Sequence, residues 1–257
     1  MIIFTLFSLP VNALDSSSTY QWLNNQAQSS EAEEILTRYG GINTTFSDQL
    51  YSWTRKQLAQ SASSVIRNHQ SNQCTESTLF KIIDGQKHFS TLLEQELQFT
   101  NSLILIETAY CIPNVSLQHA YDVYLSEEFR TNVMPQVNSF TKKGSIHCTK
   151  SDGIFGILKP ASYCYKTKEL QATNAVVIRN SFQSVSQGDE FQPFYFREEV
   201  ITFVQMDSGV GMYRATFTRS HDLSSTTKYL IRTTVDSSQG SIREQYYEWL
   251  ENDTASP

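Results

Sequence analysis

The sequence predicts an α+β fold in which a helical region precedes a region of strands and a final helix. Apolar residues recur at helical spacing through the first third of the chain. From Ser145 onward they alternate with polar residues, as in half-buried strands. A last helical segment begins at Ser241. We therefore expect an N-terminal helical region over residues 14–98 and one α+β domain over residues 99–257.

The composition is that of a globular protein, and its charge argues against a general nucleic-acid binder. Hydrophobic residues make up 39% of the 257 residues, and charged residues 18%. Acidic residues outnumber basic residues by 26 to 20, which leaves a net charge of −6. Binding to the phosphate backbone needs clustered cationic charge, so we expect no nucleic-acid partner. No apolar run approaches the roughly 20 residues that cross a bilayer.

The N-terminus indicates a signal peptide over residues 1–13. An apolar core runs from Ile2 to Leu9 and Pro10 breaks it, before the small-x-small cleavage site Val11-Asn12-Ala13. A buried N-terminal strand is the alternative interpretation. The signal peptide favours an exported protein, either periplasmic or extracellular.

The cysteines agree with export. Cys74, Cys111, Cys148 and Cys164 contain no CxxC pair, so the spacing suits neither a zinc knuckle nor a thioredoxin-type redox site. Among the possible connectivities we favour Cys74–Cys111 and Cys148–Cys164. The second pair lies on neighbouring extended segments, and the first joins the helical region to the β region. Four buried thiols are the alternative.

Helical spacing predicts three helices before residue 99. The first, over residues 30–40, has Ser30 and Glu33 as a capping box. The second extends from Ser47 to Ile66. The third begins after Thr75 and continues to residue 97. Its apolar stripe consists of Leu79, Ile82, Ile83, Phe89, Leu93 and Leu97.

The remaining elements are predicted from apolar runs, caps and turns. A buried strand covers residues 103–111, Ser116 caps a short helix, and Ser126 starts a further helical turn. The clearest strand pair is a hairpin around Asp207-Ser208-Gly209, and residues 183–194 form a long loop. A final short helix runs from Ser241 through Trp249. The predicted strands are 145–150, 153–159, 162–169, 174–182, 195–206, 210–219 and 227–235.

Residues 115–140, VSLQHAYDVYLSEEFRTNVMPQVNSF, resemble the equivalent stretch of START-like domains, the polyketide-cyclase and lipid-transfer superfamily. The shared features are an apolar helix, an acidic turn, an aromatic-Arg pair and a Pro-x-Val. They correspond here to Ala120, Tyr121, Val123, Tyr124, Leu125, Glu127, Glu128, Phe129, Arg130, Pro135 and Val137. The resemblance extends over residues 100–250 in architecture.

That resemblance implies a helix-grip fold, a curved antiparallel sheet that grips the C-terminal helix. It also implies an apolar pocket between the two that binds lipids or other hydrophobic molecules. The chain departs from the family in two respects. The terminal helix expected here is shorter than usual, and the N-terminal helical region has no counterpart in the minimal domain.

Motifs of known enzymes do not emerge from the sequence. There is no HExxH and no GxSxG elbow, and the contiguous side chains of Ser220-His221-Asp222 diverge. His147 and Cys148 are neighbours on a strand, so they point to opposite faces. The adjacent pair Glu198-Glu199 is expected to be solvated. The sequence therefore nominates no catalytic, cofactor-binding or metal-ligating residue, and no cofactor is expected.

Aromatic and arginine side chains in the predicted strands suggest the wall of a ligand pocket. An aromatic cluster surrounds the start of one strand, and an inward-facing strand arginine can hold a ligand carboxylate or phosphate. Ordinary core aromatics and outward-facing arginines are the alternative. The candidate pocket residues are Arg179, Phe194, Phe196, Arg197, Tyr213 and Arg214.

Lysines are concentrated between Lys142 and Lys168, where Asp152 is the only acidic residue. This segment could dock on anionic lipid headgroups. The alternative is a solvated hairpin face whose lysines also protect strand edges.

Together these features favour an exported, non-enzymatic binding protein for a lipid or another hydrophobic small molecule. Two further functions stay open. One is an envelope-associated protein–protein interaction module that uses the N-terminal helices. The other is a cyclase- or hydrolase-like enzyme that acts in the same cavity.

Overall fold

The computed structural model describes residues 74, 76–84, 102–133, 137–151, 161–186, 194–220 and 224–254, together with positions 17, 21 and 60. The described strands form one antiparallel eight-stranded sheet in the order β1-β2-β8-β7-β6-β5-β4-β3. The strands are β1 (Ser77–Asp84), β2 (Ser102–Pro113), β3 (Val137–Lys143), β4 (Ile146–Ser151), β5 (Ala161–Gln171), β6 (Ala175–Ser186), β7 (Phe194–Met206) and β8 (Gly209–Ser220).

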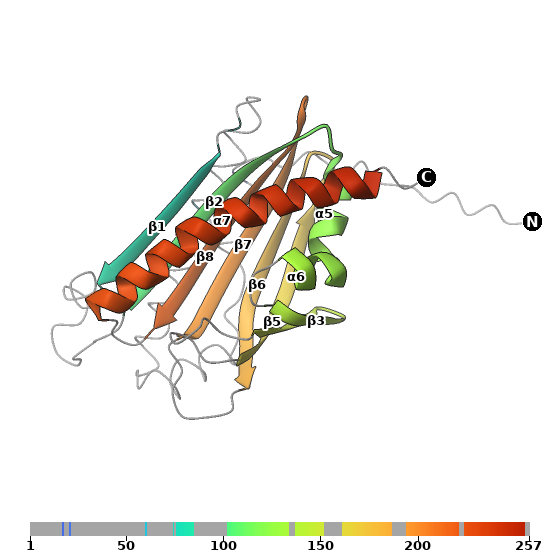
Figure 1. The fold of residues 1–257 in the computed structure, drawn as a ribbon. Helices are drawn as coiled ribbons and strands as arrows, with labels where there is room; N and C mark the ends of the chain where they lie inside the picture. Colours follow the sequence, from blue (N-terminus) through green and yellow to red (C-terminus); the bar gives the residue numbers. More distant parts are fainter. Residues whose placement is uncertain are drawn as a thin grey trace, which may run out of the picture.

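Three helices lie on one side of this sheet, which we call its inner face (Figure 1). Helices α5 (Leu117–Leu125) and α6 (Glu127–Val133) connect β2 to β3. Helix α7 (Ser225–Thr254) follows β8 and crosses the inner face diagonally, from β1 to α5. Strands β3 to β8 follow one another in both sequence and space, and β2 pairs with β8. This is the helix-grip arrangement expected from the sequence, and the α+β fold class is confirmed.

Local sequence explains the paired short helices. The Ser116 side chain accepts a hydrogen bond from the amide of His119 and caps α5. Ser126 serves both helices, because its hydroxyl donates to the carbonyl of Val123 and accepts from the amide of Phe129. One serine therefore ends α5 and starts α6, and its place at the start of α6 is as the sequence predicts.

The β7–β8 hairpin turns at Asp207-Ser208-Gly209, also as predicted. Gly209 has φ +147°, and a Cβ there would lie 2.1 Å from the carbonyl oxygen of Ile112. Only glycine allows β2 to approach the turn this closely. Gly209 thereby helps to place β2 beside β8.

Two predicted elements are wrong. Residues 77–84, expected within a helix, form β1 and pair with β2 along their whole length. Short apolar runs fit either period, and the β2 edge supplies the hydrogen bonds that decide the outcome. Residues 227–235, expected as a strand, belong to α7 instead. The strand propensity of their β-branched residues is overridden by packing, because Ile231 and Ile242 of this one helix are both buried.

The terminal helix is consequently long, with 30 residues, rather than short. Ser241 resembles a helix N-cap in the sequence, but it lies inside α7. Strand β3 was not predicted, and residues 183–186 of the predicted loop belong to β6. The signal peptide, the first predicted helix, strand 153–159 and Lys159 lie outside the described residues, as does the second predicted helix apart from position 60.

Both predicted disulfides are present. Cys74 is bonded to Cys111, with their Cα atoms 5.9 Å apart. Cys148 and Cys164 are bonded directly across β4 and β5, with a Cα separation of 4.1 Å. None of the described cysteines is free. Among the described residues, no helix combines the length and hydropathy needed to cross a bilayer.

Candidate functional site

The inner face of the sheet carries a row of buried polar side chains. Cross-strand register places Thr167 opposite Asn180, Asn180 opposite Glu199, and Glu199 opposite Thr216. These residues come from β5 to β8, so the row crosses the central strands. With two adjoining residues they form what we call the polar row: His147, Thr167, Asn180, Glu199, Arg214 and Thr216.

Hydrogen bonds connect the whole polar row. The Thr167 hydroxyl lies 3.1 Å from Nδ1 of His147 and donates to Oδ1 of Asn180 at 2.7 Å. Asn180 then donates from Nδ2 to Oε2 of Glu199 at 2.8 Å. The other oxygen of Glu199 accepts from Arg214 Nε at 2.5 Å and from Thr216 at 3.2 Å. Glu199 is therefore the acceptor on which the polar row converges.

Burial and neighbouring charges set the protonation states at both ends of the polar row. Burial alone would lower the pKa of Arg214, but the Glu199 carboxylate outweighs it and holds that pKa above its usual value. Arg214 and Glu199 are therefore a charged pair. At the other end, burial and the positive charges of Lys142 and Arg130 lower the pKa of His147 to about 4. His147 is neutral near pH 7.

An apolar cluster adjoins the polar row on the same face. Tyr124 of α5, Phe129 of α6 and Tyr246 of α7 pack together, with Tyr124 also against Phe203 of β7. Further buried residues of the sheet complete this cluster: Tyr110, Ile112, Val176, Ile178, Ile201, Val210 and Met212. The α7 half that follows Gly240 is fixed by this packing.

Tyr124 lies where the apolar cluster meets the polar row. Its side chain is only 1% exposed, and its hydroxyl has no hydrogen-bond partner among the described residues. The Tyr124 phenol is close enough to Arg214 and Tyr110 to influence their pKa values. A buried hydroxyl without a partner costs about 1–3 kcal/mol. The Thr202 hydroxyl is also buried without a partner among the described residues, and Tyr124 differs from it in its place between the aromatic cluster and Arg214.

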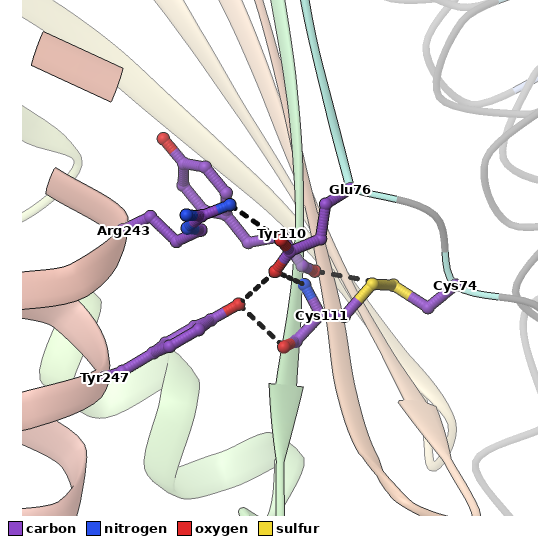
Figure 2. Close-up of polar contacts among 6 residues, drawn as sticks. All are labelled: Cys74, Glu76, Tyr110, Cys111, Arg243 and Tyr247. Carbon is purple, nitrogen blue, oxygen red and sulfur yellow. Dashed lines mark hydrogen bonds and ion pairs between the residues drawn. A yellow bond between two sulfur atoms is a disulfide. The ribbon is translucent and has the colours of Figure 1, made fainter. Parts of the chain in front are cut away.

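The helix that covers this face is fastened at one sheet edge (Figure 2). Glu76, just before β1, accepts from Arg243 at 2.7 Å and from the Tyr247 hydroxyl at 2.6 Å, both on α7. The Tyr247 hydroxyl also lies 2.7 Å from the Cys111 carbonyl oxygen. The Cys74–Cys111 disulfide stands beside these contacts and holds the Glu76 segment to β2. We call Glu76, Arg243 and Tyr247 the α7 latch.

The predicted pocket residues divide between the two faces. Arg214 lies on the inner face, in the polar row. Arg179 and Tyr213 lie on the outer face, where Arg179 pairs with Glu198 at 3.3 Å and the Tyr213 hydroxyl donates to Glu107 at 2.7 Å. The backbones of Phe194, Phe196 and Arg197 lie in β7, but their side chains are outside the described residues. Among the candidates with described side chains, only Arg214 therefore belongs to this site.

Sequence reasoning missed most of the polar row. The expectation that Glu198 and Glu199 are solvated is wrong, because both are buried on opposite faces of β7. Polar residues at Thr167 and Asn180 resemble ordinary surface positions until the strand register is known. Among the described residues, no group of three or more His, Cys, Asp or Glu side chains could hold a metal ion.

No protein-family model and no curated protein sequence matches the chain. The structure is similar to a START superfamily protein from Mycobacterium smegmatis, with 10% identity, a TM-score of 0.42, and coverage of 56% of this chain and 98% of that one. It is also similar to human STARD10, with 10% identity, a TM-score of 0.39, and coverage of 66% and 81%. An aromatase/cyclase from a Streptomyces species shares 6% identity, a TM-score of 0.41, and coverage of 61% and 97%. These likenesses concern the fold alone.

Proposed function

We propose that this chain is an exported, non-enzymatic protein that binds a lipid or another hydrophobic small molecule between the inner face of the sheet and α7. Tyr124 and Arg214 hold a polar group of that ligand. The observation that carries the proposal is the buried Tyr124 hydroxyl, which has no hydrogen-bond partner among the described residues. A ligand oxygen at that point would satisfy the hydroxyl.

The surrounding chemistry favours an apolar ligand with one neutral polar group. Binding sites for such molecules combine apolar and aromatic walls with a few placed polar groups. Here the aromatic cluster of Tyr124, Phe129 and Tyr246 adjoins a charged pair. Because Glu199 already neutralises Arg214, a hydroxyl or carbonyl suits the site better than a second carboxylate. An arginine carries further N–H donors besides Nε, and such an oxygen could accept from them.

Export is the second part of the proposal. It is supported by the signal-peptide pattern of residues 1–13 and by the two disulfides. Disulfides persist in oxidising compartments such as the periplasm and the extracellular space. Secretion of the full-length chain with loss of the first 13 residues, read by mass spectrometry of the exported product, would support this part. An unprocessed product retained inside the host cell would contradict it.

Native mass spectrometry of the unreduced protein, with organic extraction of the same sample, tests ligand binding. We expect an added mass that extracts as an apolar molecule. Titration with an NBD-labelled fatty alcohol and the corresponding fatty acid gives a second test, and we expect the alcohol to bind more tightly. A bare mass together with no binding of either probe would overturn the proposal.

Substitution of Tyr124 tests the polar anchor. Tyr124→Phe should weaken binding of the fatty alcohol about five- to ten-fold, the value of one hydrogen bond. It should leave the free energy of unfolding equal or slightly higher, because the lost hydroxyl has no hydrogen-bond partner in the described part of the chain. Tyr229→Phe is the matched control, since Tyr229 is 68% exposed on α7. Equal affinities for all three proteins would exclude Tyr124 as the anchor.

A further inference from the structure

The outer side of β3 to β5 carries a continuous set of exposed lysines. Lys143 of β3 lies opposite Ile146 of β4, which in turn lies opposite Lys166 of β5. Residues directly opposite in antiparallel strands share a face, and the alternation along each strand adds Lys150 and Lys168. All four lysines are exposed. We call Lys143, Lys150, Lys166 and Lys168 the lysine face.

The described residues of the three strands contain no acidic side chain up to Lys168. Residues 137–151 and 161–168 contain no Asp or Glu. The next acidic residue, Glu169, lies on the inner face, where it accepts a hydrogen bond from the Tyr121 hydroxyl at 2.6 Å. The lysine face is therefore strongly cationic, although the whole chain carries a net charge of −6.

An apolar side chain stands in the middle of this cationic surface. Ile146 is 45% exposed, one of the few large hydrophobic side chains that the described residues leave open to solvent. Both of its cross-strand partners, Lys143 and Lys166, are lysines. Lysine stems lie along apolar surface while their ammonium groups reach outward. The resulting surface is apolar at its centre and positive around it.

Protection of a sheet edge does not explain this arrangement. β3 is an edge strand, and lysines on an edge strand prevent pairing with another chain. Lys150, Lys166 and Lys168 lie on β4 and β5, which have neighbours on both sides. Their side chains project from the face of the sheet, not from its edge. A function in docking accounts for all four lysines and for Ile146.

We propose that the lysine face docks this protein on an anionic lipid surface, with Ile146 at the level of the headgroups. The proposal does not depend on ligand binding in the interior, because the lysine face and the polar row lie on opposite sides of the sheet. Lysines close to an anionic bilayer contribute about five-fold each to the affinity. The attraction is electrostatic, so it weakens at high ionic strength.

Vesicle sedimentation with the full-length, unreduced chain tests this proposal. We expect binding to vesicles of phosphatidylcholine mixed with phosphatidylglycerol, much weaker binding to phosphatidylcholine alone, and loss of binding in high salt. Equal binding to both kinds of vesicle would overturn the proposal. So would binding that is insensitive to salt.

Two variants locate the contact. Lys143→Gln combined with Lys166→Gln should weaken binding to the anionic vesicles about 25-fold. The control combines Lys228→Gln with Arg232→Gln, which removes the same charge from the start of α7. That helix end lies beside β1, at the opposite edge of the sheet from β3 (Figure 1). Equal losses in the two variants would show a nonspecific effect of net charge and contradict the proposal.

The role of Ile146 separates a lipid surface from an acidic protein partner. Ile146→Ser should weaken vesicle binding while leaving the weak binding of soluble polyglutamate unchanged, because only the bilayer offers an apolar layer beneath its charges. If polyglutamate binds as tightly as the anionic vesicles, and Ile146→Ser affects neither, the partner is an acidic protein and the lipid assignment is wrong.

Discussion

At Glu199 one buried carboxylate accepts hydrogen bonds from three side chains, Asn180, Arg214 and Thr216. Buried charges are costly unless they are paired and hydrogen-bonded, and this arrangement satisfies both oxygens of Glu199. Adjacent Glu198 pairs with Arg179 on the other face. The two neighbouring carboxylates therefore form two separate ion pairs on opposite faces of the sheet. The linear sequence does not reveal this division.

Removal of the Glu199 carboxylate should be strongly destabilising. In Glu199→Leu the largely buried Arg214 guanidinium loses its counter-charge, and we expect the free energy of unfolding to fall by about 3–5 kcal/mol. The double variant Glu199→Leu/Arg214→Met should recover most of that loss, because no buried charge is left unpaired. Urea denaturation measures both. A double variant that is as unstable as the single variant would contradict this account.

His147 should make stability depend on pH in mildly acidic solution. Burial lowers its pKa from 6.5 to about 4, so below pH 6.5 the unfolded chain binds a proton that the folded chain does not. The contribution of His147 is therefore complete above pH 6.5 and is lost as the pH falls toward 4. Its slope is at most about 1.4 kcal/mol per pH unit. His147→Gln should show a shallower slope in urea denaturation, and identical slopes would exclude His147 as the source.

The position of helix α7 at the sheet edge depends on the α7 latch, formed by Glu76, Arg243 and Tyr247. Tyr247→Phe removes the hydrogen bond to Glu76 and the contact with the Cys111 carbonyl. We expect the free energy of unfolding to fall by about 1–3 kcal/mol, since the acceptor at Glu76 is charged. Amide exchange in the second half of α7 should also become faster. Tyr229→Phe on the same helix is the control and should change neither quantity.

Elements with local signals were predictable, whereas those decided by distant partners were not. The α5 cap at Ser116, the shared Ser126 and the turn at Gly209 depend on neighbouring residues, and the structure confirms them. β1 and the first half of α7 depend on β2 and on burial across the fold. Their short apolar runs fit more than one period, so the sequence alone favoured the wrong structure.

The same distinction applies to the candidate site. Arg214 was a candidate because an inward-facing strand arginine can hold a ligand carboxylate or phosphate, but its partner Glu199 was expected at the surface. Strand register determines that the two side chains reach the same face, and register is a property of pairing between strands. Tyr124 was noted only for its place in the resemblance to START-like domains. Its unsatisfied hydroxyl is visible only in three dimensions.

At the scale of the whole molecule, one disulfide joins the segment before β1 to β2, and the other joins β4 to β5 near the opposite edge of the sheet. Cys74–Cys111 closes a sequence separation of 37 residues and Cys148–Cys164 one of 16. Loop-closure entropy predicts that loss of the first bridge costs about 0.7 kcal/mol more than loss of the second. Paired Cys→Ala variants measured by thermal denaturation test this order. The reverse order would show that native-state contacts outweigh the entropy of the unfolded chain.

The pairing of β2 with β8 has a consequence for folding kinetics. Strands β4 to β8 each pair with the strand that precedes them, so the meander from β3 to β8 can assemble progressively along the chain. β2 is synthesised before all of them, yet on the side away from β1 it pairs with β8, whose residues extend from Gly209 to Ser220. Contacts this distant in sequence slow folding. We therefore expect β1 and β2 to join last, so that the apolar side chains of β2 stay exposed on the nascent chain until β8 emerges.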